Sequence, residues 1–139
     1  MNVKIITTDI FVRDAKRLIK KYHSLKNELV AFEESLSENP TQGTLITENV
    51  YKIRLAVKSK GKGKSGGLRI ITFLHLLKEE DGQIQAYLLS IYDKSEFENL
   101  PDHQIQKMVT SIKSEFEAKI INQEEIKEDP ENNEDSGVN

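Results

Sequence analysis

Residues 51–77 read YKIRLAVKSKGKGKSGGLRIITFLHLL, and their pattern predicts two strands and the loop that joins them. In residues 51–58 apolar and basic side chains alternate, which is typical of a strand with one buried face. Its apolar face carries Tyr51, Ile53, Leu55 and Val57, and its other face carries Lys52, Arg54, Ala56 and Lys58. Residues 68–77 are almost continuously apolar, which predicts a central strand covered on both faces.

The loop between these strands, KSKGKGKSGG at residues 58–67, is cationic and rich in glycine. Four glycines are more than a hairpin turn needs, and they allow the backbone to approach a ligand closely. We therefore expect an exposed, mobile loop that can lie along a phosphate backbone. A solvated lysine loop that binds nothing is the alternative interpretation. The candidate RNA-binding side chains in this loop are Lys58, Lys60, Lys62 and Lys64.

The basic residues around this loop form a region of one sign, although the chain has a net charge of -3. No acidic residue occurs between Glu48 and Glu79, whereas eight lysines and arginines do. Clustering of this kind focuses an electrostatic field that attracts polyanions. The acidic residues gather instead at residues 122–139, where seven of them accompany only Lys127.

The rest of the chain completes an α+β pattern. Residues 37–43, SENPTQG, end a helical run, and residues 79–82, EEDG, predict a turn. The remaining segments predict, in chain order, a strand within 3–11, helices over 13–22 and 25–36, a strand over 83–94 and a helix over 101–121. The order β-α-α-β-β-β-α indicates a small antiparallel sheet with an N-terminal helical hairpin and a C-terminal helix.

Length and composition predict one folded domain and a tail. We place the domain at residues 1–121 and expect the acidic residues 122–139 to be disordered. We also hypothesise that this tail can fold back over the lysine loop as a polyanion mimic. The absence of cysteine excludes disulfides, thiolate catalysis and thiolate zinc sites. No apolar run approaches the length of a membrane span, and the first residues lack a signal-peptide pattern, so we expect a cytoplasmic protein.

Two segments together resemble a known family. YKIRLAVKSKGKGKSGGLRIITF at residues 51–73 and YLLSIYDKSEFENL at residues 87–100 resemble the RelE/ParE superfamily of toxins from bacterial toxin–antitoxin modules, most closely its HigB-like branch. The resemblance runs from about residue 10 to 118. It implies a RelE-like fold and an mRNA interferase, a ribosome-dependent endoribonuclease that cuts mRNA in the decoding site and inhibits translation. It also implies a cognate antitoxin, which we expect to be a small helix-turn-helix protein, and no cofactor.

Three positions match the basic residues of this family: Arg54, Arg69 and Lys94. Cleavage of RNA by its own 2′-hydroxyl needs fixed positive charge around a phosphorane and no obligatory metal, and these three side chains are the catalytic candidates. If the two strands pair, both arginines can lie on one sheet face. Lys52 shares a face with Arg54 and is a further RNA-binding candidate. The alternatives are salt-bridged sheet arginines and a solvated lysine at a strand end.

Two departures from the family pattern leave weaker functions open. Ser65 stands where the family's loop has an arginine, and Thr72 and Phe73 stand where the next strand often has a tyrosine. Catalysis is then slow, or the basic face binds RNA or the ribosome without cutting. Inhibition of DNA gyrase, known on the ParE side of the superfamily, is a third possibility. The sequence does not identify the general acid and base, for which Tyr92 and three histidines, His23, His75 and His103, are present.

Overall fold

The protein is described by a computed structural model that covers residues 2–61, 67–77, 82–96 and 99–133. Side chains are described as far as residue 122. The chain forms two compact units, Met1–Leu100 and Pro101–Asn139. The expected domain boundary at residue 121 stays a prediction. Each unit is described by itself below.

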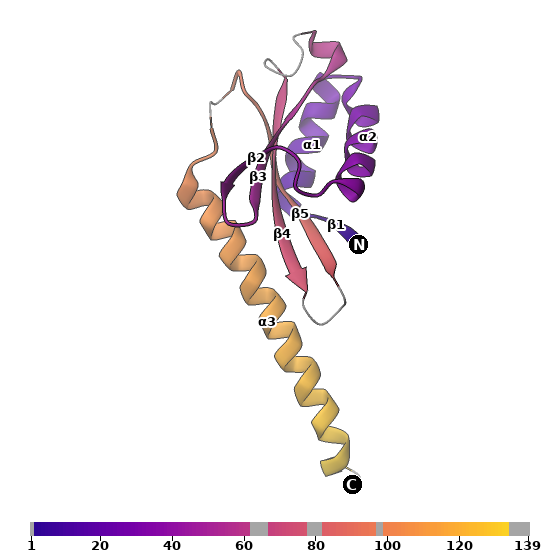
Figure 1. Ribbon diagram of the computed structural model, residues 1–139, viewed down its shortest axis with the longest axis vertical. Coiled ribbons are helices and arrows are strands. Elements are labelled where there is room, and N and C mark those ends of the chain that lie inside the picture. Colours follow the sequence, from indigo (N-terminus) through magenta and orange to yellow (C-terminus); the bar gives the residue numbers. More distant parts are fainter. Residues whose placement is uncertain (1, 62–66, 78–81, 97–98, 134–139) are drawn as a thin grey trace. The chain divides into compact units, whose positions relative to one another are not determined.

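The first unit contains a mixed sheet of five strands in the order β1-β5-β4-β3-β2 (Figure 1). The strands are β1 (Val3–Thr7), β2 (Thr44–Thr47), β3 (Val50–Leu55), β4 (Leu68–Leu77) and β5 (Gln83–Asp93). Strand β1 pairs with β5 in parallel, and the other neighbours are antiparallel. The α+β class and the helical hairpin, which lies between β1 and the other four strands, are confirmed. The structure adds β2 and the parallel pairing of β1, which we did not expect.

Strands β4 and β5 are central, as their apolar sequences predicted, and most of their residues are buried on both faces. Alternate residues of β4 point to opposite sides of the sheet. Leu68, Ile70 and Leu74 belong to the main core, which is shared with two helices. Arg69 and Phe73 therefore point to the other side.

Two helices cover one side of the sheet (Figure 1): α1 (Asp9–Lys21) and α2 (Leu25–Glu38). Thr8 caps α1 by accepting a hydrogen bond from the backbone N–H of Phe11 at 3.2 Å. The same hydroxyl lies within hydrogen-bonding distance of two carbonyl oxygens of β5, those of Leu88 and Leu89. Next to these residues the pairing of β4 with β5 shifts register at a bulge. The cap therefore fixes α1 against β5, and the side covered by these helices is the helix face of the sheet.

The first residues of the lysine loop form regular structure. After β3, a short 3₁₀ helix, η1 (Lys58–Lys60), is followed by Gly61 at φ 76, which is the left-handed conformation that favours glycine. The rest of the loop, residues 62–66, lies outside the described residues, as does most of the expected turn at 79–82.

The second unit consists of a helix, α3 (Asp102–Asn133). It includes the apolar residues that predicted a C-terminal helix, among them Ile105, Val109 and Phe116. The helix continues to Asn133, into the segment expected to be disordered, and residues 134–139 lie outside the described residues, so the disorder of the tail stays a prediction. Within the part of the chain that the structure describes, no helix is long and apolar enough to cross a membrane.

Candidate nucleic-acid interface

The two arginines chosen from the sequence lie directly opposite each other on neighbouring strands. Arg54 of β3 pairs with Arg69 of β4, and Arg69 pairs in turn with Tyr92 of β5. Side chains of directly paired residues point to the same face of a sheet. The expectation that both arginines share a sheet face is therefore confirmed. We call this side, which carries Lys52, Arg54, Arg69 and Tyr92, the arginine face; it is opposite to the helix face.

The arginine face has a positive charge that its own strands do not neutralise. Among the described strand residues, the one acidic side chain is Asp93, which follows Tyr92 and contacts Tyr22 at the end of α1, on the helix face. Like charges directly opposite each other on neighbouring strands destabilise a sheet. A bound anion such as a phosphate, to which arginine side chains donate, would offset this effect.

The two arginines differ in exposure, which the sequence did not indicate. Arg54 is exposed, whereas Arg69 is 3% exposed and its Nη1 donates to the carbonyl oxygen of Leu68 at 3.3 Å. Arg54 is therefore available to a large ligand. Arg69 is held by its surroundings and supplies a fixed positive charge beside it.

Lys52 lies on the same face, two residues before Arg54, and is partly exposed. Its Nζ donates to Asn99 Oδ1 at 2.8 Å. This bond joins β3 to the segment that follows β5. The amide is a neutral partner, so the charge of Lys52 still adds to that of the arginine face.

Tyr92 completes the row of paired residues and is 2% exposed. Burial raises the pKa of Tyr92, and a hydrogen bond with the backbone of Leu100 and, to a smaller extent, the positive charge of Arg69 oppose this effect. The raised pKa makes the phenol a weaker acid, and its burial keeps it from RNA as it does Phe73. The general acid and base therefore stay unassigned.

Lys60 differs from the other loop lysines. We expected an exposed side chain, but it is 10% exposed and its Nζ lies 3.1 Å from Asp93 Oδ1, in an ion pair on the helix face. A lysine that is committed to a buried carboxylate is a poor contact for RNA. Sequence reasoning missed Asp93, because an acidic residue at a strand end is ordinarily solvated and nothing in the sequence places Lys60 beside it.

The remaining basic candidates are exposed or lie outside the described residues. Lys94 is exposed in the turn after β5, and Lys58 is exposed in η1. Lys62 and Lys64, together with the substituted position Ser65, lie outside the described residues. The register therefore brings Lys52, Arg54 and Arg69 together, while Lys94 adds a charge at the end of the adjacent strand.

The two substituted positions of β4 lie on different faces. Thr72 shares the helix face with Ile70 and Leu74 and is completely buried, so its side chain is not part of the arginine face. Phe73 is 1% exposed, and its ring centroid lies 6.1 Å from that of His75 and 6.2 Å from that of Tyr87, both of which are half-buried. Neither side chain can contact RNA directly.

No protein-family model matches this chain. Among the described residues, no three His, Asp or Glu side chains are grouped so that they could hold a metal ion. The function is therefore inferred from the geometry of the arginine face and from the resemblance of residues 51–100.

Proposed function

We propose that this chain is the toxin of a toxin–antitoxin module, a member of the RelE/ParE superfamily closest to its HigB-like branch. In this proposal it is a metal-independent endoribonuclease that cuts mRNA on the ribosome and inhibits translation in the cytoplasm. A cognate antitoxin, a small helix-turn-helix protein, neutralises it. The observation that carries the proposal is the direct pairing of Arg54 with Arg69 on neighbouring strands, β3 and β4, whose described residues include no acidic side chain.

This pairing suits the chemistry of RNA cleavage. When the 2′-hydroxyl attacks the neighbouring phosphate, negative charge accumulates on the phosphorane oxygens. Arg54 is exposed and can bind a nonbridging oxygen, while Arg69 contributes charge from a fixed position.

One observation favours a second candidate, in which the same face binds RNA or the ribosome without cutting. Arg69 is 3% exposed and donates to a backbone carbonyl, so it is less accessible than a residue that must contact the phosphate. If Arg69 does not move when RNA binds, Arg54 and Lys52 hold the phosphate alone. Such a face binds a polyanion with little stabilisation of the transition state.

Cleavage of a reporter mRNA by the purified chain distinguishes the two candidates. The mRNA is incubated with the chain either free or on programmed ribosomes, and new 5′ ends are mapped, with a chelator present in parallel samples. We expect cuts at the codon in the decoding site that require ribosomes and persist with the chelator. Binding to ribosomes without new 5′ ends would support the second candidate and contradict the first.

A supercoiling assay with purified DNA gyrase addresses the third function in the superfamily. We expect no inhibition at concentrations of the chain that give complete mRNA cleavage. Inhibition of gyrase without cleavage on ribosomes would contradict the proposal and assign the chain to the ParE type.

A further inference from the structure

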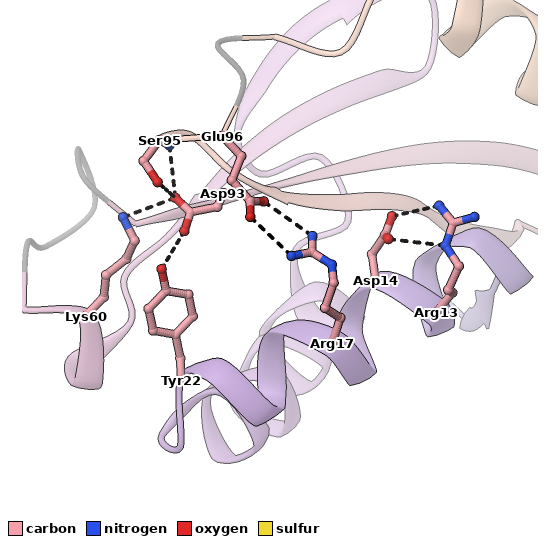
Figure 2. A network of polar contacts seen from close by, with 8 residues as sticks. All are labelled: Arg13, Asp14, Arg17, Tyr22, Lys60, Asp93, Ser95 and Glu96. Carbon is pink, nitrogen blue, oxygen red and sulfur yellow. Dashed lines mark hydrogen bonds and ion pairs between the residues drawn. The ribbon is translucent and has the colours of Figure 1, made fainter.

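A buried carboxylate joins three parts of the first unit on the helix face. The side chain of Asp93 is fully buried at the end of β5, and Figure 2 shows the groups around it. Oδ2 accepts a hydrogen bond from Tyr22 Oη at 2.5 Å, and Oδ1 is paired with Lys60 Nζ at 3.1 Å. This hydrogen bond, together with burial, raises the pKa of Tyr22 to about 12. The three groups come from the end of α1, from η1 and from β5.

The same carboxylate shapes the turn that presents Lys94. Oδ1 of Asp93 accepts hydrogen bonds from the backbone N–H of Ser95 at 2.9 Å and from its hydroxyl at 2.8 Å. The backbone N–H of Glu96 donates to the carbonyl oxygen of Asp93 at 2.9 Å. Lys94 thus lies inside a turn whose backbone is fixed from both sides by Asp93.

A second contact holds the far end of this turn. Arg17 of α1 donates from Nη1 and Nη2 to the two carboxylate oxygens of Glu96, at 3.2 and 3.3 Å (Figure 2). This ion pair is much more exposed than that of Asp93, so solvent screens it and it contributes less. The buried contact of Asp93 is therefore the stronger of the two.

The first residues of the lysine loop are also held by contacts within the first unit. Lys58 N–H donates to Glu28 Oε2 at 2.7 Å, and Ser24 and Ser59 bond to each other through their hydroxyls and their backbone N–H groups. Lys60 then adds its ion pair with Asp93. As a result η1 has contacts with α2 through its backbone and with β5 through Lys60.

Asp93 is also next in sequence to Tyr92, whose side chain lies on the opposite face beside Arg69. One residue therefore connects the arginine face with the two other sources of candidate cations, the turn with Lys94 and the lysine loop. Asp93 itself has no access to RNA, because its side chain is completely buried.

We infer that Asp93 is a positioning residue, which holds the Lys94 turn and the first turn of the lysine loop in fixed places relative to the arginine pair. The inference rests on the proposed function for its effect on cleavage. Its structural part, the ordering of segments 57–61 and 93–96, does not depend on that function.

Two double variants in a Lys60→Met background separate positioning from simple stability. Asp93→Leu with Lys60→Met replaces the ion pair by apolar groups of similar size, which is often tolerated well by the fold. Asp93→Asn with Lys60→Met also removes both charges but keeps an oxygen that can accept from Ser95. Asp14→Asn, on an acidic residue of α1 whose described ion pair is with its neighbour Arg13, is the matched control.

Amide hydrogen exchange, thermal unfolding and single-turnover cleavage on ribosomes are measured for each variant. For the Leu double variant we expect a melting temperature that is only a few degrees lower, because Tyr22 and Ser95 lose their acceptor, but much faster exchange in segments 57–61 and 93–96. We also expect a cleavage rate at saturating ribosomes that is lower by about 10- to 100-fold, with little change in the half-saturating concentration. The Asn double variant should recover most of the rate and the protection of 93–96, and the control should match the parent.

Unchanged exchange in both segments of the Leu double variant would overturn the inference. So would cleavage losses that follow the melting temperature across all variants, because that result indicates a purely structural role. If the parent chain does not cut mRNA, the proposed function fails, and the exchange data alone then support or overturn the positioning role of Asp93.

Discussion

At the level of single residues, Asp93 is a fully buried carboxylate that is surrounded by hydrogen-bond donors. Burial by itself raises the pKa of its carboxyl, but hydrogen bonds from Tyr22, Ser95 and Lys60 outweigh burial and hold the pKa well below its ordinary range. The carboxylate is therefore ionised at any pH at which the protein is expected to work.

The depressed pKa predicts a contribution of Asp93 to acid stability. A carboxyl whose folded pKa lies below its unfolded value, near 3.8, stabilises the fold above that value and loses this effect as the pH falls toward the folded pKa. Asp93→Asn should lower the free energy of unfolding at pH 7 by about 3 kcal/mol, because Lys60 keeps an uncompensated charge. Below pH 4 the free energy should fall less steeply in the variant than in the parent. Urea unfolding from pH 7 to pH 2 tests this, and parallel curves would contradict it.

Thr72 is a residue whose substitution should stabilise the protein. It is completely buried on the helix face, and within the described part of the chain its Oγ1 has no hydrogen-bond partner. Burying an unpaired hydroxyl costs about 1–3 kcal/mol. Thr72→Val keeps the shape and should therefore raise the free energy of unfolding by about 1 kcal/mol. Urea unfolding measures the change, and a loss of stability would show that the hydroxyl has a partner in solution.

At the level of elements, the close packing of the segment before the edge strand β2 against β3 requires a glycine. Gly43 precedes β2 at φ 97, and a Cβ there would meet Lys52 O at 2.5 Å and Ile53 Cγ1 at 2.7 Å. The close approach of this segment to β3 therefore excludes a side chain. A two-residue turn follows β2, with Asn49 at φ 63, a conformation that asparagine tolerates well.

Substitution of Gly43 should therefore lower the free energy of unfolding by more than the strain of its positive φ alone would. Gly43→Ala should lower the free energy of unfolding by about 3 kcal/mol, from strain and the clash with β3 together. Gly82→Ala is the matched control, since Gly82 also has positive φ but nothing within 4 Å of an added Cβ, and it should cost about 1 kcal/mol. Equal losses in chemical unfolding of the two variants would show that β2 can move away from β3.

The elements that the sequence predicted well are those with long, regular patterns. The apolar runs of β4 and β5 placed them at the centre of the sheet, and the spacing of Leu18, Leu25, Leu29 and Phe32 gave the helical hairpin. Strand β2 was missed because it has only four residues and lies between turns. The parallel pairing of β1 with β5 joins residues about eighty positions apart, and no local pattern encodes it.

The candidate site was likewise predicted only in part. The alternation of β3 and β4 across a short loop was enough to predict that Arg54 and Arg69 share a face. The burial of Arg69 and the ion pair of Lys60 with Asp93 were not predictable, because both depend on side chains brought from distant parts of the chain. The sequence assigned all four loop lysines one role, and the structure gives Lys60 a different one.

At the level of the whole molecule, charge is divided between a basic region and an acidic end. Residues 122–139 carry seven acidic side chains and one lysine. Deletion of these residues should raise the affinity for RNA about tenfold at low salt, because a competing negative charge is removed. The difference should vanish at high salt, where such interactions are screened. Fluorescence anisotropy with a labelled single-stranded RNA tests this, and equal affinities at low salt would contradict the polyanion-mimic hypothesis.

In the proposed function, the paired arginines of β3 and β4 stabilise the transition state of mRNA cleavage. The most direct test compares single-turnover cleavage on ribosomes by Arg54→Ala, Arg69→Ala and the control Arg13→Ala, which removes an exposed arginine of α1. Circular dichroism confirms folding of each variant. We expect each sheet variant to lower the rate at saturating ribosomes by about 100-fold or more, and the control to cut as the parent does. If folded Arg54→Ala and Arg69→Ala both cut at the parental rate, the arginine face is not the catalytic site.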